Sequence, residues 1–161
     1  MTAGQNKNRL HLKNVLRHIK NVQENCMIIA DFLIENKEES LAVQLIANSL
    51  IHDNSKLHGV EWHYLRDDVK KNKPYLFKAA LQNHITTNLH HPESWPSIHH
   101  MTRLYVAEFV SDINARANEF GISSHDWLKT TACKKFNMKP QDKIYREILE
   151  FKNILLDRPF E

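Results

Sequence analysis

Apolar residues recur at three- and four-residue steps through the first part of the chain, which is the spacing of one face of an α-helix. This stripe consists of Leu12, Val15, Leu16, Ile19, Val22, Cys26, Ile29 and Leu33. It predicts one long amphipathic helix that ends near Asn36, after a polar segment, residues 1–8, that we expect to be frayed. A second helix is predicted from Ser40, as its N-cap, to the His52-Asp53 pair.

The remaining apolar stripes are shorter and are separated by Gly, Pro and polar residues. Residues 60–71 predict a short helix that stops at the KKNKP run, and Pro74 suits the first turn of the next helix. Residues 86–100 contain two prolines and predict a loop. Three more helices are predicted over residues 101–118, ended by Gly121, over residues 124–136, capped by Ser124, and from Pro140 onward.

Composition supports a helical fold. The 161 residues include only three Gly and five Pro, so the chain is poor in the turn formers that hairpins need. At 42% apolar and 25% charged residues it can bury a core. We therefore expect an all-α fold, a single compact helical domain over residues 1–161, with at least five helices and no sheet of three or more strands.

Charge and cysteine content exclude several classes of protein. The formal net charge is +3, and Lys and Arg are scattered, so there is no strong nucleic-acid signature. No apolar run approaches 18 residues, the start MTAGQNKNRL is too polar for a signal peptide, and the two cysteines form no CxxC motif. We expect a cytoplasmic protein that does not interact with membranes, and the sequence leaves open whether it forms a homo-oligomer.

The histidines change the picture. There are 11, and five of them fall within residues 84–100. Together with two aspartates they occur in a particular order along the predicted helices: His18, His52-Asp53, His84, His90-His91 and Asp112. Imidazole and carboxylate ligands suit divalent Mn, Fe, Co, Ni or Zn. Glu108 lies four residues before Asp112, on the same helical face, and either orients a ligand or is a solvated carboxylate.

The order His … His-Asp … Asp resembles the HD-domain superfamily of metal-dependent phosphohydrolases, over about residues 10–120. This resemblance implies an HD-like helical bundle and an ion held by His18, His52, Asp53 and Asp112. The segments HDNSK and HITTNLHHPESW resemble a narrower family of small HD-like proteins from phages and bacteria. That narrower resemblance implies a fold and a site, but no substrate.

His84 and His90-His91 resemble the extra ligands of two-metal HD proteins. These include the HD-GYP cyclic-dinucleotide phosphodiesterases and the di-iron oxygenases related to myo-inositol oxygenase, and the resemblance implies that Asp53 would bridge two ions. However, only five residues separate His84 from His90, whereas those relatives have a much longer gap, and the GYP motif is absent. One ion is therefore expected. A second ion, with His84 and His91 as ligands, stays open, as does the choice between His90 and His91.

Other residues are candidates for substrate binding. Lys56 follows Asp53 by three residues, and HD relatives with the pattern His-Asp-x-x-Lys use this lysine to hold a substrate phosphate or oxygen. Asn88, His90 and Arg103 are further expected substrate contacts. Glu61 is a weaker candidate, as a general acid.

The expected function is hydrolysis of a phosphate ester in a nucleotide or cyclic-nucleotide-like substrate, with Asp53 and Lys56 as catalytic residues. The ion would lower the pKa of a bound water and polarise the phosphoryl oxygen. Three alternatives stay open: a di-iron oxygenase, a non-enzymatic protein that sequesters a nucleotide, and a structural histidine cluster that binds no metal.

Overall fold

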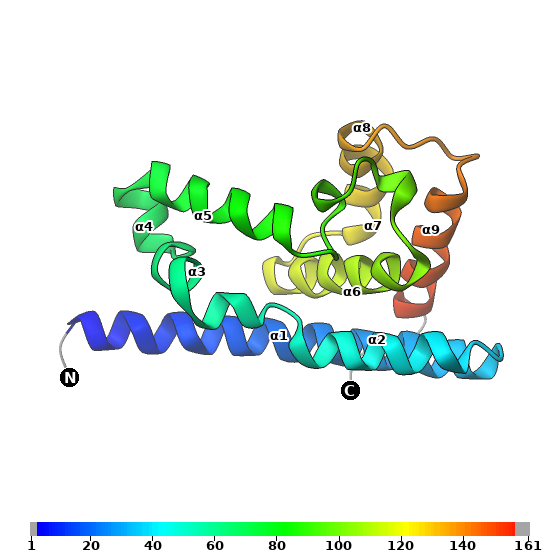
Figure 1. Ribbon diagram of the computed structural model, residues 1–161, viewed down its shortest axis with the longest axis horizontal. Helices are drawn as coiled ribbons and strands as arrows, with labels where there is room; N and C mark the ends of the chain where they lie inside the picture. Colours follow the sequence, from blue (N-terminus) through cyan, green and yellow to red (C-terminus); the bar gives the residue numbers. More distant parts are fainter. Residues whose placement is uncertain (1–2, 157–161) are drawn as a thin grey trace.

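The computed structural model describes residues 3–156, and its fold is all-α, as the sequence predicts (Figure 1). Within these residues there is no strand. The α-helices are α1 (Ala3–Glu35), α2 (Glu39–Ile51), α3 (Gly59–Tyr64), α4 (Asp67–Asn72), α5 (Pro74–Thr87), α6 (Arg103–Phe120), α7 (Ser124–Trp127), α8 (Cys133–Lys135) and α9 (Lys143–Leu156). Short 3₁₀ turns lie at η1 (Asn54–Leu57), η2 (Pro92–Ser94) and η3 (Ile98–His100), and η4 (Leu128–Ala132) is a π-helical segment.

The boundaries of several helices differ from the sequence prediction. α1 is already helical at Ala3, so the segment expected to be frayed is part of the helix, except residues 1–2, which lie outside the described residues. α2 begins at Glu39, before Ser40. The single helix expected over residues 60–71 is two helices, because the chain leaves the helical conformation at Leu65 and Arg66. The N-cap of α7 is Ser123, whose side chain accepts a hydrogen bond from the Asp126 N–H.

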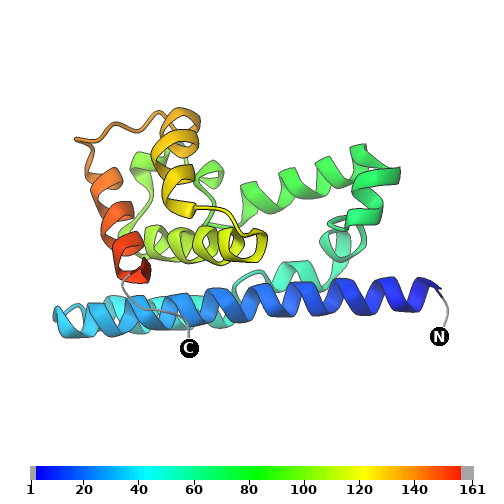
Figure 2. The same ribbon diagram turned by 180° about the vertical axis from the view of Figure 1, so that it is seen from behind.

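Two layers position the functional residues. α1 and α2 form an antiparallel pair that lies side by side at the base of the molecule in both views, and α6 packs on top of it (Figures 1 and 2). At one end α7, α8 and α9 cover α6. At the other end α3, α4 and α5 form an arch that rises from α1 and returns toward α6. The site lies where the end of α2 and the end of α5 meet α1 and α6.

The core lies between α1, α2, α6 and α9. Most of the stripe on α1 is buried in it, including Val22, Cys26, Ile29 and Leu33, each 0% exposed. Its main partners are Leu45 from α2, Val106 and Val110 from α6, and Ile148 and Phe151 from α9. Burying each such side chain contributes about 1.5–3 kcal/mol. Within residues 3–156 no helix is both long enough and apolar enough to cross a membrane.

A buried polar network joins four of the helices beside this core. The ammonium of Lys152 on α9 donates a hydrogen bond to Oδ1 of Asn114 on α6 at 2.8 Å, and Lys152 is 2% exposed. Ser124 on α7 donates to the same oxygen, and the Asn114 amide donates to Asn25 on α1. Asn25 in turn donates to the carbonyl oxygen of Ser111. Asn114 is therefore the branch point of the network.

This branch point predicts a difference in stability between two variants. Asn114→Ala removes the acceptor of a buried ammonium, so we expect the free energy of unfolding to fall by about 2 kcal/mol. Lys152→Met should cost less, because methionine fills a similar volume and leaves Asn114 paired with Ser124. Urea denaturation of both variants measures the difference. An equal loss in the two would contradict the central place of Asn114.

Candidate metal centre

Asp53 lies at the centre of the site, in the sharp turn between α2 and η1. The chain leaves the helical conformation at His52 (φ −51°, ψ 130°), and Asp53 then adopts the left-handed conformation with φ 57°. Aspartate is one of the few residues other than glycine that enter this region at modest cost. As a result, both side chains turn into the interior, where each residue is 2% exposed.

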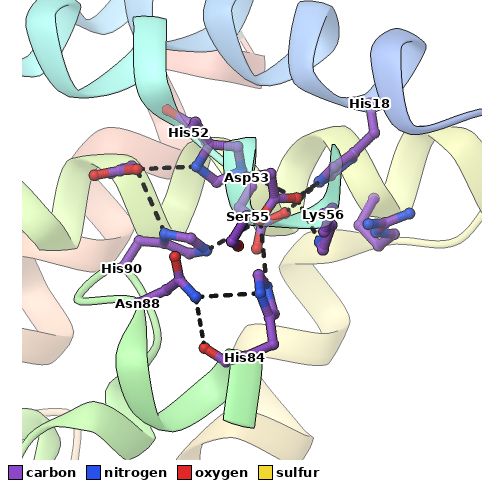
Figure 3. Close-up of polar contacts among 12 residues, drawn as sticks. His18, His52, Asp53, Ser55, Lys56, His84, Asn88 and His90 are labelled. Carbon is purple, nitrogen blue, oxygen red and sulfur yellow. Dashed lines mark hydrogen bonds and ion pairs between the residues drawn. The ribbon is translucent and has the colours of Figure 1, made fainter. Parts of the chain in front are cut away.

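Four histidines surround the Asp53 carboxylate, two at each oxygen (Figure 3). Oδ2 lies 3.4 Å from Nε2 of His18 and 3.6 Å from Nε2 of His52. Oδ1 lies 3.2 Å from Nε2 of His84 and 3.8 Å from Nε2 of His90. The four rings come from α1, the end of α2, α5 and the loop after α5. Only the folded chain brings them together.

Three groups among the described residues have ligand atoms within 4.8 Å of one another, close enough to hold an ion. We define the first half-site as His18, His52 and Asp112, and the second half-site as His84, His90 and His91. In the first, Oδ1 of Asp112 lies 3.0 Å from Nε2 of His18. Asp53 lies between the half-sites, with Oδ2 toward the first and Oδ1 toward the second. The third group, His52, His90 and Glu108, joins them.

Glutamates fix the orientation of the histidine rings. In each pair, Nδ1–H donates to a carboxylate oxygen: His18 to Glu119 at 3.0 Å, His52 to Glu108 at 2.9 Å, and His84 to Glu61 at 2.8 Å. Each ring therefore turns Nε2 toward Asp53. A carboxylate behind a histidine is the usual arrangement around protein-bound metals, because it orients the ring and raises its basicity as a ligand.

These contacts bear on the roles of three glutamates. Glu108 is buried and contacts His52, so it is not a solvated carboxylate, and its role in orienting a metal ligand stays a prediction. Glu61 accepts a hydrogen bond from Ser55 and contacts Nδ1 of His84, so it orients that ring, and its expected role as a general acid stays a prediction. The sequence analysis missed Glu119. It lies seven residues after Asp112, two turns along the same face of α6, and this spacing is the signal that could have identified it.

Buried polar atoms without hydrogen-bond partners fit a cation-binding site. Within residues 3–156, the Nε2 atoms of all five half-site histidines and Oδ1 of Asp53 are buried and make no hydrogen bond of good geometry. This includes Nε2 of His18, in spite of its short distance to Asp112. Burying a polar atom unpaired costs about 1–3 kcal/mol. Nitrogen and oxygen donors that converge without partners are what a divalent transition-metal ion requires.

The balance of charge supports the same interpretation. Five carboxylates belong to the site or contact its histidines: Asp53, Asp112, Glu61, Glu108 and Glu119. In the part of the chain that the structure describes, two permanent cations contact them, Lys56 at Asp53 and Arg116 at Glu119. Since buried charges are stable only when paired, a bound cation would offset the excess negative charge.

Lys56 lies where the sequence predicts a substrate-binding cation. It belongs to η1, three residues after Asp53, and its ammonium donates to Oδ2 of Asp53 in a short contact (Figure 3). The side chain is 17% exposed, so it lies at the edge of the buried cluster. From this position the ammonium is close to the half-sites without being able to act as a ligand while protonated.

The ionisable groups predict how the stability of the metal-free protein depends on pH. Burial lowers the pKa of His18, but the carboxylates of Asp112, Asp53 and Glu119 outweigh it and raise that pKa from 6.5 to about 10. Burial raises the pKa of Asp53 and of Asp112, but Lys56 and His52 at Asp53, and His18 at Asp112, hold both pKa values well below 3.8.

The His18 contribution to stability is thus complete below about pH 6.5 and is lost as the pH rises toward about 10. The aspartate contributions are complete above about pH 3.8 and are lost at lower pH. Burial lowers the pKa of His90 and of His91 to about 3, so their contributions are complete above about pH 6.5 and are lost as the pH falls.

We therefore expect the melting temperature, measured with a chelator present, to be highest near pH 6.5 and to fall toward both pH 4 and pH 9. His18→Gln should flatten the alkaline fall. If the melting temperature of His18→Gln still falls as steeply between pH 6.5 and pH 9, a group other than His18 causes the fall.

Two residues that were expected to contact substrate, Arg103 and His90, make other contacts in the structure. Arg103 is not available to a substrate, because its guanidinium donates to Glu38 at 3.0 Å and to Glu150 at 2.8 Å and lies on the ring of Phe151. It also lies nine residues before Asp112, about 13 Å away along α6. His90, expected to bind substrate, belongs with His91 to the second half-site.

A pocket of about 180 Å³ opens on the site. Its polar lining includes Asn88, as expected for a substrate contact, and its apolar lining includes Leu89 and Tyr105. His52, Asp53 and His90 of the centre also line it, and the remaining lining residues are Asn48, Ile51, Thr87 and Glu108. The amide of Asn88 also donates to the carbonyl oxygen of His84 at 2.8 Å, which fixes the loop that carries His90.

The chain was compared with known protein families, curated proteins and solved structures. The model of a protein family of unknown function (DUF5662) matches residues 7–153, which include all the residues of both half-sites. No curated protein and no solved structure matches the chain.

Proposed function

Because the chain belongs to the DUF5662 family, whose function is unknown, we propose its function from its own site: metal-dependent hydrolysis of a phosphate ester, in the manner of the HD superfamily. The substrate class is a nucleotide or cyclic-nucleotide-like phosphate. The observation that carries the proposal is the buried Asp53 carboxylate, with a pair of histidines at each oxygen and a lysine ammonium beside it.

The donor set fits a catalytic centre. His18, His52, Asp53 and Asp112 would hold one ion, with imidazole and carboxylate groups that suit Mn, Fe, Co, Ni or Zn. The three histidines of the second half-site, with the other oxygen of Asp53, would hold a second ion. When bound, such an ion lowers the pKa of a water and polarises a phosphoryl oxygen.

The other residues would bind and orient the substrate. The Lys56 ammonium would leave Asp53 for a phosphate oxygen and neutralise its charge. Asn88 lines the pocket with a side-chain oxygen that can accept a hydrogen bond from a substrate hydroxyl or amine. Leu89 and Tyr105 offer an apolar wall against the uncharged part of the substrate. The two free cysteines, Cys26 and Cys133, are consistent with the cytoplasm as the compartment.

The test is elemental analysis of the purified protein, followed by a screen for phosphate release. Nucleotides and cyclic nucleotides are incubated with the protein and added Mn²⁺, with a chelator as the control. Bound transition metal and chelator-sensitive phosphate release are expected. If the protein binds none of the five metals, the histidines form a structural cluster. If nucleotides bind and are recovered intact, the protein sequesters them.

One observation favours a second candidate, a di-iron oxygenase. The two half-sites and the Asp53 between them offer five imidazoles and two carboxylates, and imidazole is a good ligand for iron. Iron as the metal present after expression, with O₂ consumption on an organic substrate and no phosphate release, would favour the oxygenase over the hydrolase.

A further inference from the structure

Glu108 on α6 contacts one histidine from each half-site with the same oxygen. Its Oε1 lies 2.9 Å from Nδ1 of His52 and 3.5 Å from Nδ1 of His90. Its Oε2 accepts a hydrogen bond from the amide of Asn48 at 3.2 Å. Glu108, His52 and His90 are each at most 4% exposed, so these contacts are largely shielded from solvent.

The other two orienting glutamates each serve one half-site. Glu119 contacts His18 of the first half-site, and Glu61 contacts His84 of the second. Among the contacts of the described residues, neither of these two carboxylates reaches a histidine of the opposite half-site. All three residues are glutamates that contact a histidine, and only Glu108 contacts both half-sites. Glu61 and Glu119 are therefore matched controls for a substitution of Glu108.

Glu108 also closes a ring of contacts around the boundary between the half-sites. The planes of His52 and His90 are tilted by 43°, with ring centroids 4.3 Å apart. Nδ1 of both rings faces Glu108, while Nε2 of His52 faces Oδ2 of Asp53 and Nε2 of His90 faces Oδ1. A shift of either ring thus moves a carboxylate that holds the other ring. Two carboxylates, Asp53 and Glu108, connect the half-sites from opposite sides.

We propose that Glu108 is a positioning residue for both half-sites at once, so that its loss weakens binding of both ions, whereas the loss of Glu61 or Glu119 weakens binding of one. This inference rests on the proposed metal centre. The reason is geometric: a ligand ring that loses its carboxylate can rotate, and the ion must then restore its orientation. Loss of such a carboxylate typically costs 10- to 100-fold in metal affinity.

The test measures Mn²⁺ affinity and stoichiometry by isothermal titration calorimetry in two backgrounds. Asp112→Asn disables the first half-site and leaves the second to be titrated, and His84→Ala does the reverse. Glu108→Gln is expected to raise the dissociation constant about 10- to 100-fold in both backgrounds. Glu61→Gln should do so only in the Asp112→Asn background, and Glu119→Gln only in the His84→Ala background.

The melting temperature of each metal-free variant shows whether Glu108 is instead needed for folding. Glu108→Gln should lower the melting temperature no more than Glu61→Gln and Glu119→Gln do. If Glu108→Gln does not fold, Asn48→Ala replaces it. This variant releases Oε2 of Glu108 and should weaken both half-sites by a smaller factor, about 3- to 10-fold, since one hydrogen bond is lost.

The outcomes distinguish this inference from the proposed function. If Glu108→Gln weakens binding in one background only, the shared role is wrong and the metal centre still stands. If the wild-type protein binds no Mn²⁺, Co²⁺ or Zn²⁺, both the metal centre and the role of Glu108 are overturned.

Discussion

Asp53→Asn is expected to remove bound metal from both half-sites and to lower phosphate release by about 10³-fold or more, since the ions supply several kcal/mol of transition-state stabilisation. The substitution replaces one carboxylate oxygen by an amide group and removes the negative charge that faces four imidazoles. Elemental analysis and initial rates under saturating Mn²⁺ measure the two effects.

Asparagine is the appropriate replacement because of the backbone. Asp53 has φ 57°, and asparagine adopts this left-handed conformation about as readily as aspartate does. Alanine there adds strain of about 1 kcal/mol, which would mix a folding defect with the loss of a ligand. Asp126→Asn, at an exposed carboxylate on α7, is the matched control and should keep metal and activity. Full metal content and full turnover in Asp53→Asn would remove Asp53 from the centre.

Lys56→Ala is expected to lower turnover by about 10- to 100-fold and to leave the metal content intact. An ammonium contact to phosphate in a partly buried site contributes about 1.5–3 kcal/mol when the charge develops. Metal should be retained, because the ammonium competes with an ion for Oδ2 of Asp53 instead of holding it. Parallel measurement of turnover and metal content is the test, and His52→Ala, which should lose both, is the contrasting variant.

An exposed lysine provides the baseline for this comparison. Lys78→Ala, on the outer face of α5, should change neither quantity. If Lys56→Ala turns over substrate at the wild-type rate, then Lys56 has no part in the reaction. A loss of metal as well as activity would instead make Lys56 a residue on which the structure of the centre depends.

Residue type and helical periodicity were sufficient to predict the candidate metal ligands that lie on helices or at their ends. His18 borders a clear apolar stripe, and His52-Asp53 ends a helix, so their approach to a common core follows from local pattern. The fold class follows from the same periodicity. The break at Leu65 and Arg66 gives no such signal, since no Gly or Pro marks it, and two short helices were therefore predicted as one.

Helical spacing can point to an orienting glutamate, but the histidine with which each glutamate pairs could not be predicted, because the partners are distant in sequence. Glu119 lies 101 residues from His18, and only the packing of α1 against α6 brings them together. Arg103 fails as a substrate contact for a similar reason. Its partners Glu38 and Glu150 lie 65 and 47 residues away, and they neutralise a cation that the sequence alone leaves free.

The glutamate pairs also determine the tautomers of the histidines. A neutral imidazole whose Nδ1–H donates to a carboxylate has its lone pair on Nε2. Glu108 and Glu61 therefore select, in neutral His52 and His84, the tautomer that a metal ion needs. His18 differs, since neighbouring carboxylates outweigh burial and raise its pKa to about 10, so that at neutral pH an ion must displace a proton from it. Long-range ¹H–¹⁵N correlation spectra of the metal-free protein would show this contrast as two kinds of ring nitrogen, and calorimetry in buffers of different ionisation enthalpy would detect the proton released when the first half-site fills.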